Sequence, residues 1–231
     1  MPTVTKNKTV DYLKSKKGSL SEIFPFNTIP AAPLLEIEKN TIVKNYARRE
    51  YIFMEDDSPN YVWFVKEGHV KIAHFSMEGR SQTIALKGPM GMFGVAAFGE
   101  SEYGVYAMAE TEASVIAVPN QVFQVLLDRY PAFAKAMVGH MSKLLRQAKE
   151  MEAISVSRAE KRLLHALIEM AGEYGTTIPL TRREIAEMAG TSVETCIRTF
   201  SHLDGTGLMS SAHGKLTINS VESLRSRMEE L

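Results

Sequence analysis

Between residues 20 and 120 the hydrophobic positions come in short runs, several of them alternating with polar positions, and glycines separate the runs. A period of two is typical of β-strands that bury one face. Short strands with turn signals about every ten residues predict an antiparallel sandwich or barrel. The expected strands are Tyr61–Val65, Val70–Phe75, Thr83–Leu86, Val105–Ala109 and Ser114–Val118.

After Pro119 the hydrophobic positions follow a helical period. Pro119 suits the start of one helix, and Tyr130–Pro131 marks a break before a second, because the residue before a proline disfavours the α region. Apolar or small residues of the second helix recur at steps of four and three, which is a heptad seam. We expect this seam to pack against the same helix of a second subunit; packing on the chain's own β domain is the alternative. The seam residues are Met137, Met141, Leu144, Ala148, Met151 and Ser155.

The remaining residues predict three helices and a hairpin. Val156–Ala171 has the pattern of one helix. Thr181 and Glu184 form a capping box, which predicts a second helix from about Arg182. Gly190 suits the left-handed turn that ends it, and Thr191 or Ser192 can cap the third. The stretch "LMSSAHGKLTI" then reads as a hairpin that turns at His213–Gly214.

The third helix has two different faces at about 100° per residue. The apolar face carries Val193, Cys196, Ile197, Phe200 and Leu203, and the polar face carries Glu194, Thr195, Arg198, Ser201 and His202. An ordinary helical hairpin, with Glu194 and Arg198 as a surface ion pair, is one interpretation. The caps, the glycine at the turn and the following hairpin together favour a helix-turn-helix with a wing.

Composition narrows the class of protein. A chain of 231 residues can form two domains, and 45% hydrophobic with 23% charged residues is typical of a globular protein. No apolar run is long enough to span a membrane, and the start of the chain lacks the apolar core of a signal peptide, so we expect a cytoplasmic protein with no membrane partner. The net charge is zero, which gives nucleic-acid binding no support of its own. Residues 1–20 form a basic N-terminal arm.

Candidate chemistry is sparse. No nucleophile–base pair, GxSxG segment or metal-spaced set of His and Asp is visible, which argues against an enzyme and a metal site. Cys196 is the only cysteine, so an internal disulfide and a cluster held by several cysteines are excluded. We interpret Cys196 as a small buried hydrophobe rather than as a redox switch.

The whole chain resembles the CRP/FNR family of bacterial transcription regulators. The stretch "LTRREIAEMAGTSVETCIRTFSHLDGTGLMSSAHGKLTI" carries the resemblance, and "TSVETCIR" followed by "SAHGK" is specific. The resemblance implies an α+β fold: an N-terminal antiparallel, jelly-roll-like β-roll sensor domain over residues 21–130, a dimerisation helix over 131–155 and a winged helix-turn-helix domain over 156–231. It also implies a homodimer that binds a palindromic DNA operator and contacts RNA polymerase.

The resemblance assigns roles on the third helix. Glu194 matches the glutamate that accepts from a cytosine amino group, and Arg198 matches the arginine that donates to guanine. Val193 stands where the cyclic AMP receptor branch has a second base-reading arginine, and Ile197 where the FNR branch has serine. We therefore expect a half-site nearer TTGA than TGTGA. The candidate DNA-binding residues are Thr181, Arg182, Ser192, Val193, Glu194, Thr195, Ile197, Arg198, Ser201, His213 and Lys215.

The effector of the expected sensor domain is the least determined feature. In the family the cyclic nucleotide pocket follows a Phe-Gly-Glu segment and uses an Arg-Ser pair. Here Val95 stands at the glutamate and Tyr103–Gly104 at the Arg-Ser pair, and no Lys or Arg lies between Lys87 and Arg129, so a phosphate would have no cation. This argues against cyclic AMP and leaves an apolar small molecule or no effector. The candidate pocket residues are Phe93, Gly94, Val95, Ala96, Tyr103, Val105, Met137 and Met141.

Two alternatives stay open. Haem needs an axial ligand in an apolar pocket, and His74, on the same strand parity as Val70 and Ile72, is the candidate ligand of a haem-based gas sensor. An iron–sulfur cluster of the FNR type lacks its N-terminal cysteines. A protein-interaction module whose helix-turn-helix no longer binds DNA is the remaining alternative, given the neutral charge.

Overall fold

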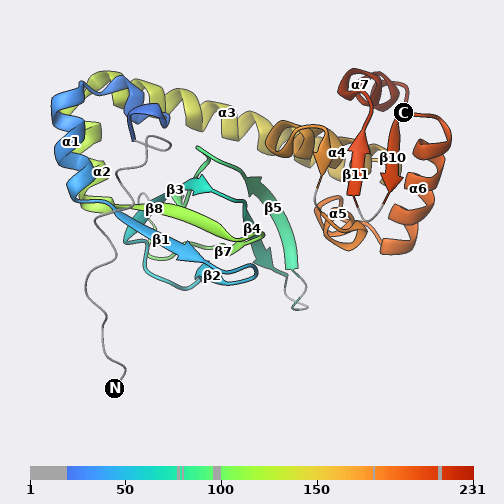
Figure 1. The fold of residues 1–231 in the computed structure, drawn as a ribbon, viewed down its shortest axis with the longest axis horizontal. Coiled ribbons are helices and arrows are strands. Elements are labelled where there is room, and N and C mark those ends of the chain that lie inside the picture. Colours follow the sequence, from blue (N-terminus) through green and yellow to red (C-terminus); the bar gives the residue numbers. More distant parts are fainter. Residues whose placement is uncertain (1–19, 77–78, 80, 96–99, 179, 213–214) are drawn as a thin grey trace. The chain divides into compact units, whose positions relative to one another are not determined.

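The computed structural model describes residues 20–76, 79, 81–95, 100–178, 180–212 and 215–231 (Figure 1). The expected arm up to residue 19 and the candidate site residues Ala96 and His213 lie outside this part of the chain. The chain divides into two compact units, Met1–Val70 with Lys87–Lys143 (unit 1) and Lys71–Leu86 with Leu144–Leu231 (unit 2). Among the described residues, no helix has the length and apolar character needed to cross a membrane.

Two four-stranded sheets form the β region. One has the order β1-β8-β3-β6, and the other has the order β2-β7-β4-β5. The bounds are β1 Ile42–Tyr46, β2 Tyr51–Phe53, β3 Tyr61–Glu67, β4 Val70–Phe75, β5 Ser81–Lys87, β6 Met92–Phe93, β7 Tyr106–Ala109 and β8 Ala113–Pro119. All five expected strands are present. The strands β1, β2 and β6 were not expected, because runs this short or this weakly alternating give no reliable period.

The β3 strand lies at the centre of the first sheet. It pairs with β8 in antiparallel register, with Phe64 opposite Ile116, and on its other side with β6. Four buried phenylalanines pack ring against ring on this sheet, and they join β3 to the helices that cover it. They are Phe26, Phe64, Phe123 and Phe133.

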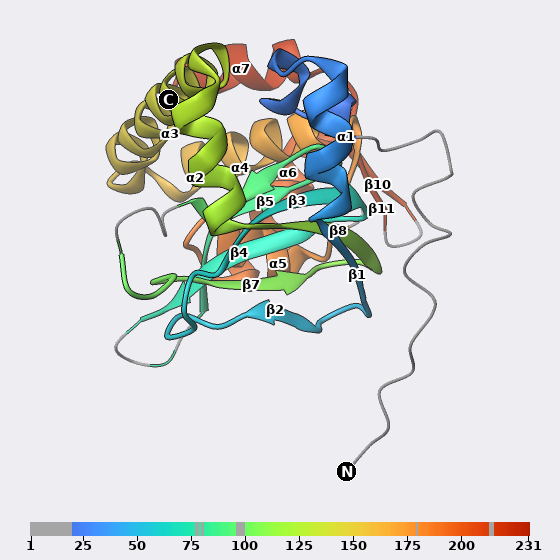
Figure 2. The same ribbon diagram turned by 90° about the vertical axis from the view of Figure 1, so that its left-hand side faces the viewer.

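Helices α1 and α2 lie side by side beside this sheet (Figure 2). The helix α1, Ala31–Lys39, follows the short 3-10 turns Leu20–Glu22 and Phe26–Thr28 and buries Leu34 and Ile37, which are one turn apart. The reading of residues 20 to 120 as β throughout is therefore wrong here. Pro30 fits the start of α1, and three residues between the buried positions is a helical spacing.

The helix boundaries around the prolines follow the expectation. The helix α2 covers Asn120–Arg129 directly after Pro119, and Tyr130 is extended. The long helix α3 then covers Pro131–Ser155. The next helix, α4, covers Ala159–Tyr174, so the expected start at Val156 is three residues too early, because α3 ends at Ser155 and Arg158 is extended.

The C-terminal part has the arrangement of a winged helix-turn-helix. The helices α5, Arg182–Met188, and α6, Val193–Gly205, are followed by the strands β10, Met209–Ala212, and β11, Lys215–Ile218. A third strand, β9 Thr177–Ile178, pairs with β11, and helix α7, Val221–Glu229, closes the chain. The core contains Leu163, Leu167, Ile185, Phe200, Leu203 and Leu216.

Candidate functional site

The capping box at the start of α5 is present. The Thr181 hydroxyl accepts from the Glu184 backbone N–H at 3.3 Å, and the Glu184 carboxylate accepts from the Thr181 N–H at 2.7 Å. Two N–H groups that a helix N-terminus leaves without partners are thereby satisfied. This local device fixes where the first helix of the pair begins.

The turn between the two helices is also as expected. Gly190 has a φ of +57°, in the left-handed region where a side chain is disfavoured. Ser192 is the N-cap of α6, and its side chain accepts from the Thr195 N–H at 3.1 Å. The second helix therefore begins at Val193 and directs its first turn toward solvent with Glu194 exposed.

Arg162 of α4 holds this turn from behind, and sequence reasoning missed it. Its guanidinium donates to the Ala189 carbonyl at 2.9 Å and to the Gly190 carbonyl at 3.0 Å. These carbonyls follow the end of α5, where no intrahelical donor reaches them. An arginine 27 residues upstream carries no local signal of this role, because only the packing of α4 brings it to the turn.

The two faces of α6 are separated largely as expected. Cys196, Phe200 and Leu203 are at most 2% exposed and belong to the core, whereas Glu194, Arg198, Ser201 and His202 are exposed. Thr195 is half-buried. Val193 is half-buried and packs against the core. The polar face thus offers a carboxylate and a guanidinium one turn apart.

The placement of Ile197 on the buried face is wrong. Its side chain is 46% exposed, and Thr199 is buried in its place. At about 100° per residue, Ile197 lies about 60° from Glu194 and about 100° from Cys196, so it sits at the border between the faces. The core of unit 2 centres on the Cys196–Leu203 line, and this orientation turns Ile197 outward.

Two titratable groups of α6 have shifted pKa values. Hydrogen bonds from the backbone at Glu194 and then from the Ser192 side chain hold the pKa of the Glu194 carboxyl below its usual value, so that it is an acceptor at neutral pH. Burial raises the pKa of the Cys196 thiol to about 11, with Arg182 opposing the shift. Cys196 is buried and free, as its interpretation as a small hydrophobe requires.

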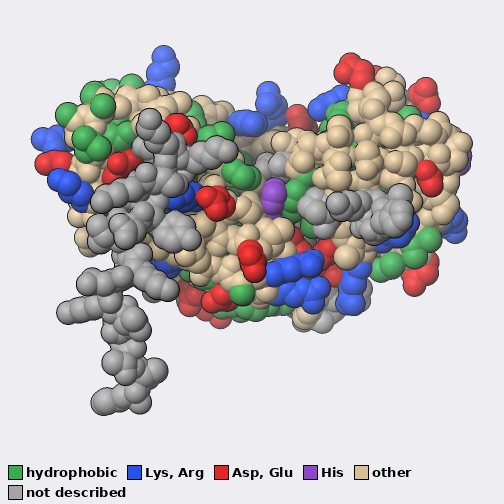
Figure 3. All heavy atoms as spheres, in the orientation of Figure 1, with side chains coloured by type: hydrophobic (Ala, Val, Ile, Leu, Met, Phe, Trp, Pro, Cys, Tyr) green, Lys and Arg blue, Asp and Glu red, His purple; other side chains and the backbone are tan. Residues whose placement is uncertain are grey.

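The other candidate DNA-binding residues surround α6. Arg182 donates to the Ser211 hydroxyl at 2.9 Å, which connects α5 to β10. Lys215 begins β11. Charges of both signs are interspersed on the face drawn in Figure 3, in agreement with the zero net charge of the chain. A small hollow of about 300 Å³ between α5 and the wing is lined by Leu180, Thr181, Arg182, Arg183, Phe200, Ser211 and Leu216.

In unit 1 an aromatic cluster occupies the neighbourhood of the expected effector pocket. The Phe53 and Tyr103 rings stack with centroids 3.7 Å apart. The Trp63 indole N–H donates to the Tyr103 hydroxyl at 2.9 Å, and that hydroxyl donates to the Tyr61 carbonyl at 2.8 Å. Burial raises the pKa of Tyr103, so it stays a neutral donor. Phe93 stacks on Phe53 from another side.

Gly94 is required beside this cluster. Its φ is +74°, and a Cβ there would come within 2.8 Å of Trp63 Cδ1 and 3.2 Å of Tyr103 Cε1. A side chain would therefore meet both rings as well as an unfavourable backbone region. The glycine allows the chain after β6 to lie directly against the aromatic rings.

The seven candidate pocket residues in the described part of the chain lie in different surroundings. Phe93, Gly94 and Tyr103 meet around Trp63, where side chains fill the space. Val95 and Met137 instead pack against the phenylalanine core, Met141 is 37% exposed and Val105 is half-buried. Tyr103 is itself buried among these aromatic side chains, and the effector pocket stays a prediction.

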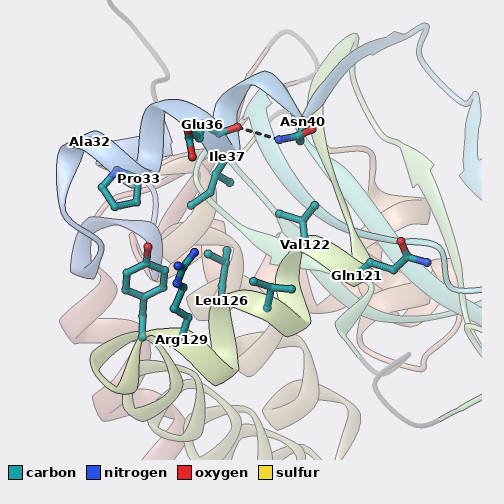
Figure 4. Close-up of a pocket in the computed structure, with 11 residues that line it drawn as sticks. Ala32, Pro33, Glu36, Ile37, Asn40, Gln121, Val122, Leu126 and Arg129 are labelled. Atoms are coloured by element: carbon teal, nitrogen blue, oxygen red, sulfur yellow. Dashed lines mark hydrogen bonds between the residues drawn. The ribbon is translucent and has the colours of Figure 1, made fainter.

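A groove does lie between α1 and α2 (Figure 4). It has a volume of about 730 Å³ and apolar lining that includes Ile37 and Leu126, with Arg129 at one end. None of the candidate pocket residues lines it. The lining residues are Ala32, Pro33, Glu36, Ile37, Asn40, Gln121, Val122, Val125, Leu126, Arg129 and Tyr130.

His74, the candidate haem ligand, lies near the end of β4. Val70 and Ile72 on the same parity are buried, whereas His74 is half-buried with its Nδ1 3.3 Å from the Phe75 carbonyl oxygen. The expected inward parity is therefore only partly met. Haem ligation by His74 stays a prediction.

The apolar stripe of α3 differs from the expected seam. Met137 is 5% exposed and packs in the core of its own unit, so it is not available to a partner. Val138, Met141 and Leu145 are 67%, 37% and 60% exposed. Together with the exposed Ala148 they follow steps of three, four and three, which is a heptad spacing. This stripe shares Met141 and Ala148 with the expected seam and has Val138 and Leu145 in place of Met137 and Leu144. Leu144 is half-buried, and the Met151 side chain is outside the described residues.

Comparisons with known proteins agree with both halves of this arrangement. Residues 43–130 match the cyclic nucleotide-binding domain family, and residues 161–227 match the Crp-like helix-turn-helix domain family. The chain is 26% identical to the cyclic AMP receptor protein of Thermus thermophilus over 176 residues, 75% of this chain and 82% of that protein. It is 27% identical to the nitrogen fixation regulation protein FixK of Azorhizobium caulinodans over 175 residues, 71% of this chain and 70% of that protein.

The fold is similar to a solved structure. FixK2 from Bradyrhizobium japonicum superposes with a TM-score of 0.73 at 23% identity, over 80% of this chain and 96% of that one. A β domain of the cyclic nucleotide-binding type and a winged helix-turn-helix define a DNA-binding transcription regulator. The chain belongs to the CRP/FNR family of bacterial transcription regulators.

Proposed function

We propose that this regulator is a cytoplasmic homodimer that binds a palindromic operator with TTGA-type half-sites and contacts RNA polymerase there. The observation that carries the proposal is the exposed pair Glu194 and Arg198 on α6, one turn apart above a buried face. A carboxylate accepts from the cytosine amino group, and a guanidinium donates to guanine N7 and O6. The pair therefore reads one G·C base pair in each half-site.

The proposed half-site follows from Val193. This residue is half-buried against the core and carries no hydrogen-bond donor, so a second guanine contact of the TGTGA type has no side chain to make it. Val193 therefore supports TTGA over TGTGA.

The dimer rests on the exposed stripe of α3. Val138, Met141 and Leu145 present apolar area that burial against a second copy would remove from water. A two-fold dimer brings two copies of α6 to major grooves one helical turn, about 34 Å, apart.

We also propose that the regulator binds DNA without cyclic AMP. The Tyr103 hydroxyl and ring make contacts to Trp63, Tyr61 and Phe53 that a nucleotide would have to replace. No Lys or Arg between Lys87 and Arg129 would compensate the phosphate charge. Mass spectrometry of the purified protein tests for an apolar effector, and its visible spectrum tests for haem. A Soret band that is lost on His74→Ala would identify haem as the effector, and absence of a Soret band would refute haem.

Fluorescence anisotropy with labelled duplexes tests the DNA proposal. We expect tighter binding to a TTGA palindrome than to a TGTGA palindrome, without added cyclic AMP. Arg198→Ala should cost about 1–3 kcal/mol and relax the preference at the G·C pair. Arg129→Ala, the same change at an exposed arginine of α2, is the matched control and should bind like the wild type.

A salt titration separates a DNA-binding protein from an interaction module with an inactive helix-turn-helix. If the dimer neutralises about four phosphates, a rise in salt from about 50 to about 200 mM should weaken DNA binding about a hundredfold. Absence of binding at low salt, or an Arg198→Ala variant that reads its operator as the wild type does, would refute the proposal.

A further inference from the structure

Ile197 is an exposed isoleucine on the helix proposed to read DNA. Its side chain is 46% exposed, although the apolar residues Cys196 and Phe200 on the same helix are at most 2% exposed. A single exposed hydrophobic residue on an ordinary surface needs no explanation. Its position gives it meaning here, because it directly precedes Arg198 and follows Glu194 by one helical turn.

The exposed Ile197 side chain has as a neighbour a serine whose hydroxyl proton is used within the helix. Ser201, one turn later, donates its hydroxyl hydrogen to the Ile197 carbonyl at 3.0 Å, so this proton is turned back onto the helix. Isoleucine is β-branched and has one strongly preferred χ1 rotamer in a helix. Its methyl groups are therefore held in place before DNA binds.

The chemistry of the major groove offers one apolar partner at base level. Every base edge there presents hydrogen-bonding groups, and thymine adds its C5 methyl group. Ile197 has no donor or acceptor with which to read the other groups. Val193, the other apolar residue of the first turns, is half-buried against the core, which leaves Ile197 as the more exposed apolar contact.

We propose that Ile197 is a specificity-determining residue that recognises the C5 methyl group of a thymine next to the G·C pair read by Glu194 and Arg198. This inference rests on the proposed reading of DNA by α6. The contact selects thymine over cytosine by shape and desolvation, because it excludes water from two methyl surfaces without a hydrogen bond.

Deoxyuridine is the probe, since it differs from thymidine only by this methyl group. Each thymine of one TTGA half-site is replaced in turn by deoxyuridine, and the dissociation constant is measured by anisotropy. Loss of one buried methyl group should weaken wild-type binding about fourfold at one thymine. The other two thymines of the half-site, one of which lies on the complementary strand opposite the adenine, should show no change.

Two variants assign the effect to Ile197. Ile197→Ser should abolish the thymine–uracil difference at that position while keeping the preference for the G·C pair, and Ile197→Val should retain most of the difference. Val125→Ser, a similar change at an exposed β-branched residue of α2 outside the candidate DNA-binding residues, is the matched control and should keep the full difference. Circular dichroism confirms that each variant is folded before binding is measured.

The outcomes separate the two proposals. Tight, G·C-dependent operator binding with no thymine–uracil difference at any position would overturn the role of Ile197 and leave the proposed function standing. An Ile197→Ser variant that keeps the wild-type ratio of dissociation constants for the uracil and thymine duplexes would overturn the role of Ile197 in the same way. Absence of binding to every duplex would overturn the proposed function and this inference together.

Discussion

At the scale of single residues, the buried Tyr103 side chain organises the packing of the aromatic cluster in unit 1. Tyr103 satisfies its hydroxyl twice inside the protein and stacks its ring on Phe53. Stacked aromatic rings and a satisfied buried hydroxyl both stabilise the folded state. One consequence is that the neighbouring glycine tolerates no substitution.

Gly94→Ala tests this packing. We expect the free energy of unfolding to fall by about 2 kcal/mol or more, because the new Cβ combines positive-φ strain with overlap on Trp63 and Tyr103. Gly104→Ala is the matched control, since Gly104 has a φ of +65° but nothing within 4 Å of the new Cβ. Urea denaturation followed by circular dichroism measures both. Equal losses in the two variants would show that strain alone matters and that the rings give way.

Cys196 makes stability depend on pH in the alkaline range. Its pKa rises from 9.0 to about 11 on folding because burial disfavours the thiolate. The folded state therefore binds the thiol proton more tightly than the unfolded state does. The resulting contribution to the free energy of unfolding is complete below about pH 9 and is lost as the pH rises through about 11. We expect the melting temperature of the wild type to fall more steeply between pH 9 and pH 11 than that of Cys196→Ala. Parallel pH profiles would contradict the burial of the thiol.

At the scale of elements, the helix-turn-helix is held by a clamp from a third helix. The capping box, Gly190 and Ser192 define each helix end locally. Arg162 of α4 connects the turn to another element by donating to two of its carbonyls. A guanidinium presents several donors in a fixed plane, which suits two adjacent acceptors.

Arg162→Ala should therefore lower the free energy of unfolding of unit 2 by about 1–3 kcal/mol, since the carbonyls of Ala189, Gly190 and Ser157 each lose a charge-assisted hydrogen bond. Arg183→Ala removes an exposed ion pair with Glu187 on α5 and should cost less than about 0.5 kcal/mol. Chemical denaturation of both variants gives the comparison. An Arg162→Ala variant as stable as Arg183→Ala would mean that the clamp adds no stability.

At the scale of the whole molecule, binding to the proposed palindromic operator requires more than one chain. A palindrome presents two half-sites, and one chain has a single α6. The helix α3 contributes residues to both units and carries the exposed stripe Val138, Met141, Leu145 and Ala148. In the proposed dimer, the association of two α3 helices is therefore the step on which affinity for the palindrome depends.

Leu145→Asp should convert the dimer to a monomer and weaken binding to a full palindrome by at least about a hundredfold, because a charge would replace a buried apolar contact at each side of the seam. Lys143→Asp, an exposed change on the opposite face of α3, is the control and should remain dimeric. Light scattering after gel filtration and anisotropy measure the two effects. A monomeric variant that still binds the palindrome tightly would refute the dimer.

The sequence by itself determined the features whose causes lie within a few residues. The capping box of Thr181 and Glu184, the Ser192 cap and the break at Tyr130–Pro131 appear where they were expected, because each depends on backbone groups nearby in the chain. The five expected strands followed from their hydrophobic runs for the same reason.

Tertiary structure decided what depends on partners far along the chain. Met137 is buried and Ile197 is exposed because packing set the rotation of α3 and α6, and neighbouring residues at a helix border give no clear signal of it. Tyr103 occupies the interior of unit 1 through contacts with residues 40 or more positions away. Long-range pairing of this kind is chosen by the best filling of a core, which no short stretch of sequence specifies.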